Sequence, residues 1–296
     1  MSSVGSNPNA RKKSFLLVFN SEAGKGQPEH KKEIITRYLT GKNCDFKIIN
    51  TNELDKEISL NVYNAVVAVG GDGTVLKVIP YLANTNVKLG IIPCGTANLF
   101  AASLCIPSNI QKAIDILING STSNVDIGKA GDEYFALRIG IGYDAEVINS
   151  TSRRWKQKLG YLAYFIQGVI NCLHLSNKSY KITIDNKTIE VNANSIIVAN
   201  AGNMFRNLFT IAPAGSINDG KLDIFILLAR NLWDFLVVFF QILTGKHYLN
   251  PNVIYGQAQS IKIETNYKNT HIDGEPYYNS NLDISVIPKA LMVMVP

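Results

Sequence analysis

The chain has 296 residues, of which 46% are hydrophobic, so it can form one large or two ordinary globular domains with a buried core. The formal net charge of +6 favours an acidic partner such as nucleic acid, an anionic membrane surface or a polyphosphate, but the excess is too diffuse to choose among them. The four cysteines form neither a CxxC pair nor a His-Cys spacing typical of zinc. The cytosol is therefore the expected compartment.

Residues 1–13 are polar and lack the apolar core of a signal peptide, so we expect a flexible tail. After it, short β-branched stretches alternate with helical patterns up to about residue 120. Strands are predicted at Ser14–Asn20, Asp45–Asn50, Ala65–Val69 and Lys88–Ile92, and helices at Pro28–Leu39, Glu53–Leu60, Thr74–Ala83, Thr96–Leu104 and Ile110–Ile118. This alternation predicts an α/β domain with a parallel sheet covered by helices. Ligands bind such sheets at the carboxyl ends of the strands.

The pattern changes to period-two stretches in the second half, which predicts a β-rich antiparallel domain. The predicted strands are Lys181–Asp185, Ser195–Asn200, Lys221–Leu227, Ser260–Glu264 and Asp283–Ile287, and two long helices surround Tyr161 and Phe235. A polar linker at Asn119–Asn124 marks the expected boundary. We therefore predict domains at 14–121 and 122–296, and it stays open whether the last strand returns to the first domain.

Three glycine-containing turns each leave a predicted strand of the first domain and open a helix. They are NSEAGKG at Asn20–Gly26, GGDGT at Gly70–Thr74 and PCGTAN at Pro93–Asn98. One such turn is usually a simple connection, but three at one sheet edge favour phosphate binding by backbone N–H groups. None has the spacing of GxxxxGK[ST] or GxGxxG, so a different phosphate-binding arrangement is needed.

The order strand, GGDGT and then PCGTANLFA resembles the diacylglycerol kinase catalytic family, which includes sphingosine and ceramide kinases and bacterial multi-lipid kinases. NAD kinases share GGDGT but are not expected to continue with P-x-G-T-A-N, which stands here at Pro93–Asn98. Further segments resemble the family in order: LRIGIGYDAEV at Leu137–Val147, KLGYLAYFIQGV at Lys158–Val169, the segment Ala199–Ile224, and HIDGEP at His271–Pro276. The resemblance covers nearly the whole chain and implies an active site in the cleft between two domains.

The resemblance implies an ATP-dependent lipid kinase that needs Mg²⁺. The nucleotide site implied comprises Asn20, Thr51, Gly70, Gly71, Asp72, Gly73, Thr74, Gly95, Thr96 and Asn98. The glycines would let the backbone lie against the phosphates, and the Asp72 carboxylate is assigned to Mg²⁺ directly or through water. A second, structural Mg²⁺ is implied at the carboxylate of Asp219 with the carbonyls of Ser216 and Lys221.

The family's Asp-Gly-Glu maps to Asp273, Gly274 and Glu275. The residues alone favour a simple hairpin turn here, whereas the resemblance implies that Glu275 is the general base, with Asp273 as its neighbour or alternate. Two carboxylates this close could raise one pKa toward the working range. The histidines show no mutual spacing of a metal site and are expected at the surface or satisfied in the core.

A diacylglycerol-like acceptor stays in the bilayer, so a peripheral membrane enzyme is expected, with no nucleic-acid partner and with a homodimer as an open option. No segment reaches the ~20 apolar residues needed to cross a bilayer. Arg153–Leu175 and Leu232–Leu243 are candidate interfacial helices, although a core helix of the second domain is the commoner origin of such patterns. Two alternatives stay open: an NAD kinase, and a non-catalytic nucleotide- or lipid-binding regulator.

Overall fold

The computed structural model of the chain describes residues 12–20, 28–55, 58–142, 145, 177–201, 203–204, 209–210 and 214–296. The chain packs as two compact units. The first comprises Met1–Gly95, Ile106–Ser123 and Met292–Pro296, and the second comprises Thr96–Cys105 and Asn124–Leu291. The expected tail lies almost wholly outside the described residues, as does the expected helix around Tyr161.

The sheet of the first unit is parallel and is built from the four predicted strands. They are β1 (Ser14–Phe19), β2 (Asp45–Asn50), β3 (Ala65–Gly70) and β4 (Leu89–Pro93), in the order β2-β1-β3-β4. Every residue of β3 and β4 is buried, as expected for the apolar runs of a parallel sheet covered on both faces. The end of strand β18 (Asn281–Val295) adds a further parallel strand, with Val293 opposite Leu89.

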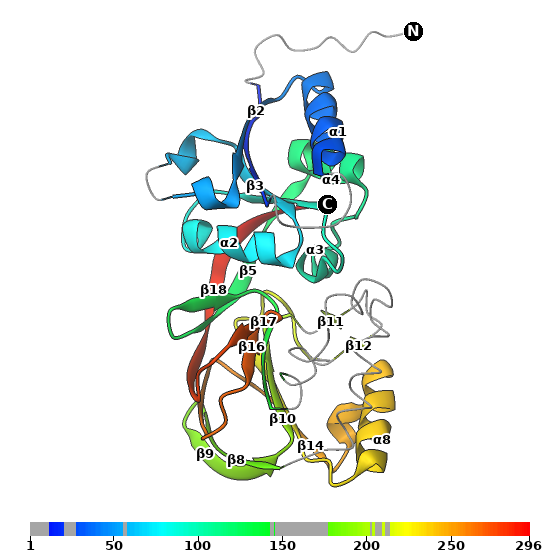
Figure 1. The fold of residues 1–296 in the computed structure, drawn as a ribbon, viewed down its shortest axis with the longest axis vertical. Coiled ribbons are helices and arrows are strands. Elements are labelled where there is room, and N and C mark those ends of the chain that lie inside the picture. The colour runs from blue at the N-terminus through cyan, green and yellow to red at the C-terminus, as the bar shows by residue number, and fades with distance from the viewer. Residues whose placement is uncertain are drawn as a thin grey trace. The chain divides into compact units, whose positions relative to one another are not determined.

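Three helices cover this sheet: α1 (Pro28–Gly41), α2 (Asp72–Leu82) and α4 (Ile110–Asn119). The α1 connection runs from β1 to β2, toward one edge of the sheet. The α2 connection runs from β3 to β4, in the opposite direction across the sheet. Because such crossovers are right-handed, the two helices lie on opposite faces. Figure 1 shows α1 together with α4 on one face and α2 on the other.

Two sequence predictions in this region are wrong. The helix expected at Glu53–Leu60 is replaced by two 3₁₀ turns, η1 (Thr51–Glu53) and η2 (Leu60–Val62). Between them, Leu54, Asp55, Ile58 and Ser59 are not helical, and the Asp55 side chain accepts the N–H of Ile58 at 3.1 Å. The linker expected at Asn119–Asn124 is mostly strand, because β5 (Ser121–Ala130) begins within it.

The second unit is a sandwich of antiparallel strands. One sheet has the order β14-β13-β10-β7-β16-β17, with bounds Val253–Ala258, Leu222–Leu227, Ser195–Ala199, Arg138–Gly142, Thr270–Ile272 and Glu275–Tyr277. The opposing strands are β5, β6 (Glu133–Phe135), β8 (Lys178–Ile184), β9 (Lys187–Ala193), β15 (Ser260–Glu264) and the first part of β18. Isoleucines from both layers, such as Ile139 and Ile263, form one buried cluster. The predicted fold class, an α/β domain followed by a β-rich antiparallel domain, is confirmed.

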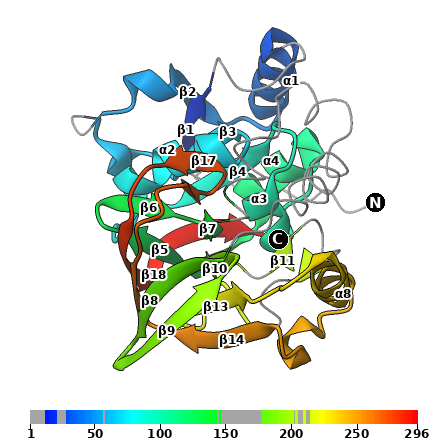
Figure 2. The same cartoon turned by 60° about the horizontal axis from the view of Figure 1, so that its bottom comes forward.

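Among its described residues, the second unit also contains four short elements and one longer helix. The short elements are α3 (Leu99–Ser103), β11 (Asn203–Met204), β12 (Phe209–Thr210) and η3 (His247–Leu249). The longer helix, α8 (Leu232–Leu243), is the one predicted around Phe235, and Figure 2 shows it beside β13 and β14. Within the described part of the chain, no helix combines the length and the apolar character that a bilayer crossing requires.

Candidate functional site

The connections of the parallel sheet run in opposite directions on the two sides of the β1–β3 pair. The chain passes from β1 outward to β2 on one side, and from β3 outward to β4 on the other. Phe19 lies opposite both Asn50 and Val69, and Gly70 lies opposite Pro93. The residues that follow these strands therefore share one edge, and the Cys94 N–H donates to the Gly70 carbonyl at 2.8 Å. Such a switch point is where doubly wound sheets bind ligands. It brings together the predicted residues Asn20, Thr51, Gly70 and Gly95.

Gly70 ends β3 in close contact with the side chain of Thr74. A Cβ atom added to Gly70 would lie 2.1 Å from Thr74 Oγ1, so no larger residue fits without movement. Thr74 is only 1% exposed, and its hydroxyl has no hydrogen-bond partner among the described groups. Its predicted role as a phosphate donor stays a prediction, and its clear structural role is to close the turn over Gly70.

The first turn of α2 carries Gly71, Asp72 and Gly73. The Gly71 carbonyl accepts the N–H groups of Thr74 at 2.9 Å and Val75 at 3.2 Å, and no side chain caps the helix. A Cβ atom added to Gly73 would meet no atom within 4 Å. A helix N-terminus with an open glycine beside it suits an anion such as a phosphate, which the helix dipole and the N–H groups attract.

The third glycine turn adds a cation to this edge. Lys31 of α1 donates from Nζ to the Cys94 carbonyl at 3.0 Å. Sequence reasoning missed Lys31 as a site residue, because nothing in its pattern separates it from the other surface lysines of α1. Thr96 and Asn98 belong to the second unit. Asn98 has a left-handed backbone with φ of 50° and precedes α3.

Asp273 is held by backbone N–H groups of the segment before β7. Its Oδ2 accepts from Ala136 at 2.7 Å, its Oδ1 accepts from Arg138 at 2.6 Å, and Leu137 donates to both oxygens at 3.0 and 3.2 Å. The Asp273 N–H donates in return to the Arg138 carbonyl at 2.9 Å. A carboxylate occupied in this way fixes the β16–β17 hairpin and is poorly placed to accept a proton from a substrate.

The hairpin turn itself is formed by Asp273 and Gly274, whose φ angles are 48° and 91°. Positive φ at both positions is the geometry of a tight two-residue hairpin. His271, fully buried in β16, accepts the Gly274 N–H at Nδ1 over 3.2 Å. Its Nδ1 must therefore be unprotonated. Glu275, which follows Gly274, begins β17 and has an exposed side chain.

The turn Ser216–Lys221 brings together the three residues predicted to hold a structural metal. The Asp219 carboxylate accepts the N–H of Ser216 at 3.1 Å and that of Lys221 at 3.0 Å, whereas carbonyls were expected to face a shared ion. The Ser216 carbonyl accepts the Asp219 N–H at 3.4 Å. Asp219 Oδ2 also accepts a hydrogen bond from Gln257 Nε2 at 3.4 Å. Oδ1 accepts the Lys221 N–H and keeps a second lone pair, which suits a hydrated Mg²⁺ with few protein ligands. The metal assignment stays a prediction.

Two buried aspartates that sequence reasoning missed surround this turn. Asp126 accepts the N–H of Gly220 at 2.6 Å and that of Lys289 at 2.7 Å. Burial raises the pKa of the Asp223 carboxyl, and nearby Asp219 raises it further, although the hydrogen bonds from Tyr255 and Gln257 act in the opposite direction. The sequence did carry a signal for both aspartates, because each is a single carboxylate between apolar strand residues, in Val-Asp-Ile for Asp126 and in Leu-Asp-Ile for Asp223.

Tyr255 links Asp223 to the chain before the turn. Its hydroxyl donates to Asp223 Oδ1 and accepts the Ala214 N–H at 3.2 Å. Burial and the Asp223 carboxylate both raise the pKa of Tyr255 well above its ordinary value, so the hydroxyl remains a donor. Among the described residues, no group of three His, Cys, Asp or Glu side chains is placed to hold a metal ion.

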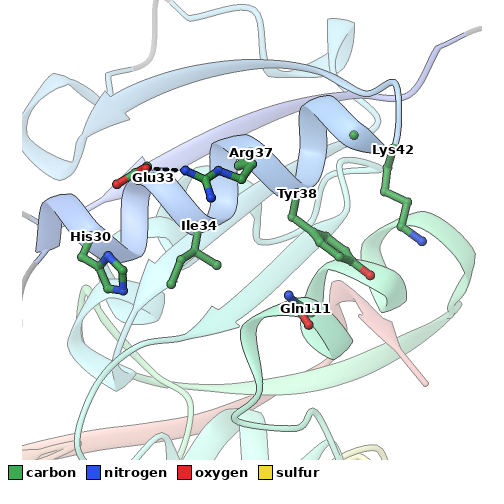
Figure 3. A pocket seen from close by; sticks show the side chains of 8 residues that line it. His30, Glu33, Ile34, Arg37, Tyr38, Lys42 and Gln111 are labelled. Carbon is green, nitrogen blue, oxygen red and sulfur yellow. Dashed lines mark hydrogen bonds and ion pairs between the residues drawn. The ribbon is translucent and has the colours of Figure 1, made fainter.

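A groove of about 390 Å³ lies along α1, away from these residues. It is lined by His30, Glu33, Ile34, Arg37, Tyr38, Gly41, Lys42 and Gln111. Figure 3 shows Arg37 paired with Glu33 on the helix surface, and Tyr38 between Gln111 and Lys42. None of the predicted site residues lines this groove, so it does not bear on the phosphate-binding edge.

Comparison with known proteins identifies the family to which each part of the chain is similar. Residues 14–130 match the family described as "Diacylglycerol kinase catalytic domain", and residues 138–295 match the family described as "YegS C-terminal NAD kinase beta sandwich-like domain". A "Diacylglycerol kinase" of Bacillus subtilis is 34% identical over 74% of this chain and 74% of its own. An uncharacterized protein of Synechocystis sp. is 31% identical over 95% of this chain and 70% of its own.

Solved structures show the same architecture. A crystal structure of a diacylglycerol kinase from Bacillus anthracis str. Sterne has a TM-score of 0.76 and 25% identity, and the match covers 96% of this chain and 97% of that one. The family expected from the sequence motifs is thereby confirmed. With both domains matched and a relative above 30% identity over three quarters of the chain, this protein belongs to the bacterial diacylglycerol kinase family of lipid kinases.

Proposed function

We propose that this lipid kinase transfers the γ-phosphate of ATP to the hydroxyl of a membrane lipid, and that diacylglycerol is the acceptor and phosphatidic acid the product. The observation that carries the proposal is the uncapped start of α2 at Gly71–Thr74, with open space at Gly73, at the switch point of the parallel sheet. That arrangement suits a polyphosphate, and the family supplies the lipid acceptor.

The nucleotide would lie against Gly70, Gly71 and Gly73, with Asn20 and Thr51 beside it. Asp72, Thr74, Gly95, Thr96 and Asn98 complete the proposed set. Asp72 would hold Mg²⁺ directly or through water, and an ion there would neutralise charge on the transferred phosphoryl group. The Asp219 carboxylate, with the carbonyls of Ser216 and Lys221, would hold a second, structural Mg²⁺. Phosphoryl transfer depends mainly on such positioning and charge neutralisation.

Glu275 is proposed as the general base. It would take the proton of the acceptor hydroxyl as the oxygen bonds to the γ-phosphorus and ADP leaves. Its side chain is exposed, whereas three N–H groups occupy the carboxylate of Asp273. Asp273 would then act as a positioning residue, because its bonds hold the hairpin on which Glu275 stands.

An acceptor that resides in a bilayer requires the enzyme to work as a cytoplasmic, peripheral membrane protein. NAD is the competing acceptor, because NAD kinases share the GGDGT loop and the second domain matches a family with that name. A non-catalytic regulator is disfavoured by the retention of Asp72 and Glu275.

The test is transfer of radiolabelled phosphate from ATP in the presence of Mg²⁺, with diacylglycerol, monoacylglycerol, ceramide and a sphingoid base in mixed micelles, and with NAD in a parallel reaction. The expected result is label in a chloroform-extractable product formed fastest from diacylglycerol. Asp72→Asn should abolish the product while leaving the fold intact. Label in NAD would refute the lipid acceptor, and a different labelled lipid would replace diacylglycerol with that lipid.

A further inference from the structure

The helix α8 has two apolar faces, and one of them packs on the sheet while the other is exposed within the described part of the chain. Val238 is 2% exposed and belongs to a buried cluster with Ile197, Phe225 and Val253 of the strands beneath. Phe235 and Ile242 pack against the same cluster. These contacts anchor the helix on the sheet. They leave the opposite face outward.

That outward face consists of apolar side chains. Trp233, Val237 and Phe240 are 76%, 44% and 59% exposed and follow one another at four and three positions, so they form a single stripe. Leu232 and Leu243 extend it at the two ends. Every exposed side chain within α8 is apolar. An apolar stripe on the outer side of a helix that is already anchored by its inner side indicates a docking face.

The stripe continues into η3, where Tyr248 is 47% and Leu249 is 69% exposed. We call the seven residues Leu232, Trp233, Val237, Phe240, Leu243, Tyr248 and Leu249 the α8 face. Exposed basic residues flank the helix at both ends, Arg230 before it and Lys246 after it. Asp234, the acidic residue of the helix, accepts the Arg230 N–H at 2.9 Å and lies off the stripe.

We propose that the α8 face inserts into an anionic lipid surface and holds the enzyme at the bilayer that contains its acceptor. The proposal rests on the lipid-kinase function above and names the surface through which it meets the membrane. The helix is about 18 Å long, at 1.5 Å per residue, which is too short to cross a bilayer. It therefore lies in the interface, where tryptophan and tyrosine rings are favoured and flanking cations meet anionic headgroups.

A second copy of the chain fits this face less well. In a two-fold dimer with antiparallel α8 helices, Arg230 of each copy would approach Lys246 of the other, and the net charge of +6 adds further repulsion. An anionic surface satisfies the same cations. The charge pattern therefore selects lipid over self-association.

The first experiment measures binding to phosphatidylcholine vesicles with and without phosphatidylglycerol, by sedimentation. The double variant Trp233→Ser/Phe240→Ser should bind anionic vesicles at least about tenfold more weakly, since each ring removes a large buried apolar area. Val62→Ser is the matched control, because Val62 is 67% exposed in the first unit. Unchanged binding by the double variant, or equal loss in the control, would overturn the proposal.

The second readout uses the two tryptophans of the chain. Trp155→Phe leaves Trp233 as the only tryptophan. Its emission should shift to the blue on addition of anionic vesicles, and brominated acyl chains should quench it. Binding without either change would show that another surface makes the contact. If the wild type self-associates and the double variant does not, the α8 face binds a second copy of the chain, and the proposal is refuted.

Activity separates this proposal from the proposed function. With short-chain diacylglycerol dissolved as monomers, the double variant should turn over at the rate of the wild type, whereas with vesicle-borne diacylglycerol it should lose at least about tenfold in rate. Trp233-dependent vesicle binding by a protein that phosphorylates no lipid would uphold the docking face and refute the lipid-kinase function. Equal losses on both substrates would refute the docking role.

Discussion

The Asp273 carboxylate and the Arg138 backbone N–H are joined by a hydrogen bond of 2.6 Å, the shortest of the bonds that tie the β16–β17 hairpin to the start of β7. We expect Asp273→Asn to lower the free energy of unfolding by about 1–3 kcal/mol, because the amide NH₂ would face N–H donors. Denaturant unfolding measures this. Glu275→Gln is the matched variant and should unfold like the wild type. If Asp273→Asn keeps full stability and loses only kcat, Asp273 is catalytic after all.

His271 supports the same turn from inside the sheet. His271→Leu should leave the Gly274 N–H without its acceptor, at a cost of about 1–3 kcal/mol, and should lower kcat without changing KM for ATP. His271→Asn places an oxygen near the position of Nδ1 and should restore part of kcat, whereas His271→Gln, whose polar atoms lie one bond further out, should not. Equal activity of the Asn and Leu variants would refute the positioning role.

The two outer glycines of the GGDGT turn should respond differently to alanine. Gly70→Ala places Cβ against Thr74 Oγ1 and should destabilise the fold by about 1–3 kcal/mol, and Thr74→Ala should partly rescue it. Gly73→Ala meets open space in a helix and should leave stability equal or slightly raised. If the phosphates approach this backbone, Gly73→Ala should still weaken ATP binding, as measured by calorimetry. Unchanged ATP affinity would place the nucleotide elsewhere.

The Tyr255–Asp223 pair should make stability depend on pH at both ends of the range. The pKa of each group is raised on folding, so the folded state holds protons that the unfolded state releases. Stability should therefore fall as pH rises above the ordinary Asp pKa of 3.8, and again above the ordinary Tyr pKa of 10.0. Urea unfolding at stepped pH measures both slopes.

Tyr255→Phe is the variant that separates the two contributions. The variant should remove the contribution of Tyr255 to the fall in stability at alkaline pH. It should also raise the pKa of Asp223 further, because the carboxylate loses a hydrogen-bond donor. The free energy of unfolding at neutral pH should drop by about 1–3 kcal/mol. An alkaline slope identical to that of the wild type would contradict the assignment.

Much of the first unit could be predicted from the sequence because its strands are continuous apolar runs with glycines at their ends. Ala65–Val69 with the following GGDGT needed no tertiary information. The helix predicted at Glu53–Leu60 was wrong, because this segment has no continuous apolar run, and the structure has two 3₁₀ turns at its ends. The start of β5 was mistaken for a linker because its polar residues are paired in a strand whose outer side is exposed.

Sequence alone could propose site residues where a motif lies in one stretch, but it could not show contacts between distant segments. Strand β18 was recognised only at Asp283–Ile287, because Pro288 and the left-handed Lys289, with φ of 53°, interrupt the pattern. The Lys289 N–H donates to Asp126, far away in the sequence, and this bond supports the irregular position. The anchoring of Asp273 by residues 136–138 is likewise a tertiary contact, so sequence alone left two candidate bases.

The most direct measurement of the central claim is the product formed from ATP and diacylglycerol by the purified protein, identified by mass spectrometry, for the wild type and Glu275→Gln side by side. The account predicts phosphatidic acid from the wild type. Glu275→Gln should form it about 100-fold or more slowly, as expected for loss of a general base, with an unchanged Kd for ATP. Phosphatidic acid formed at equal rates by both proteins, or phosphate found only on NAD, would contradict it.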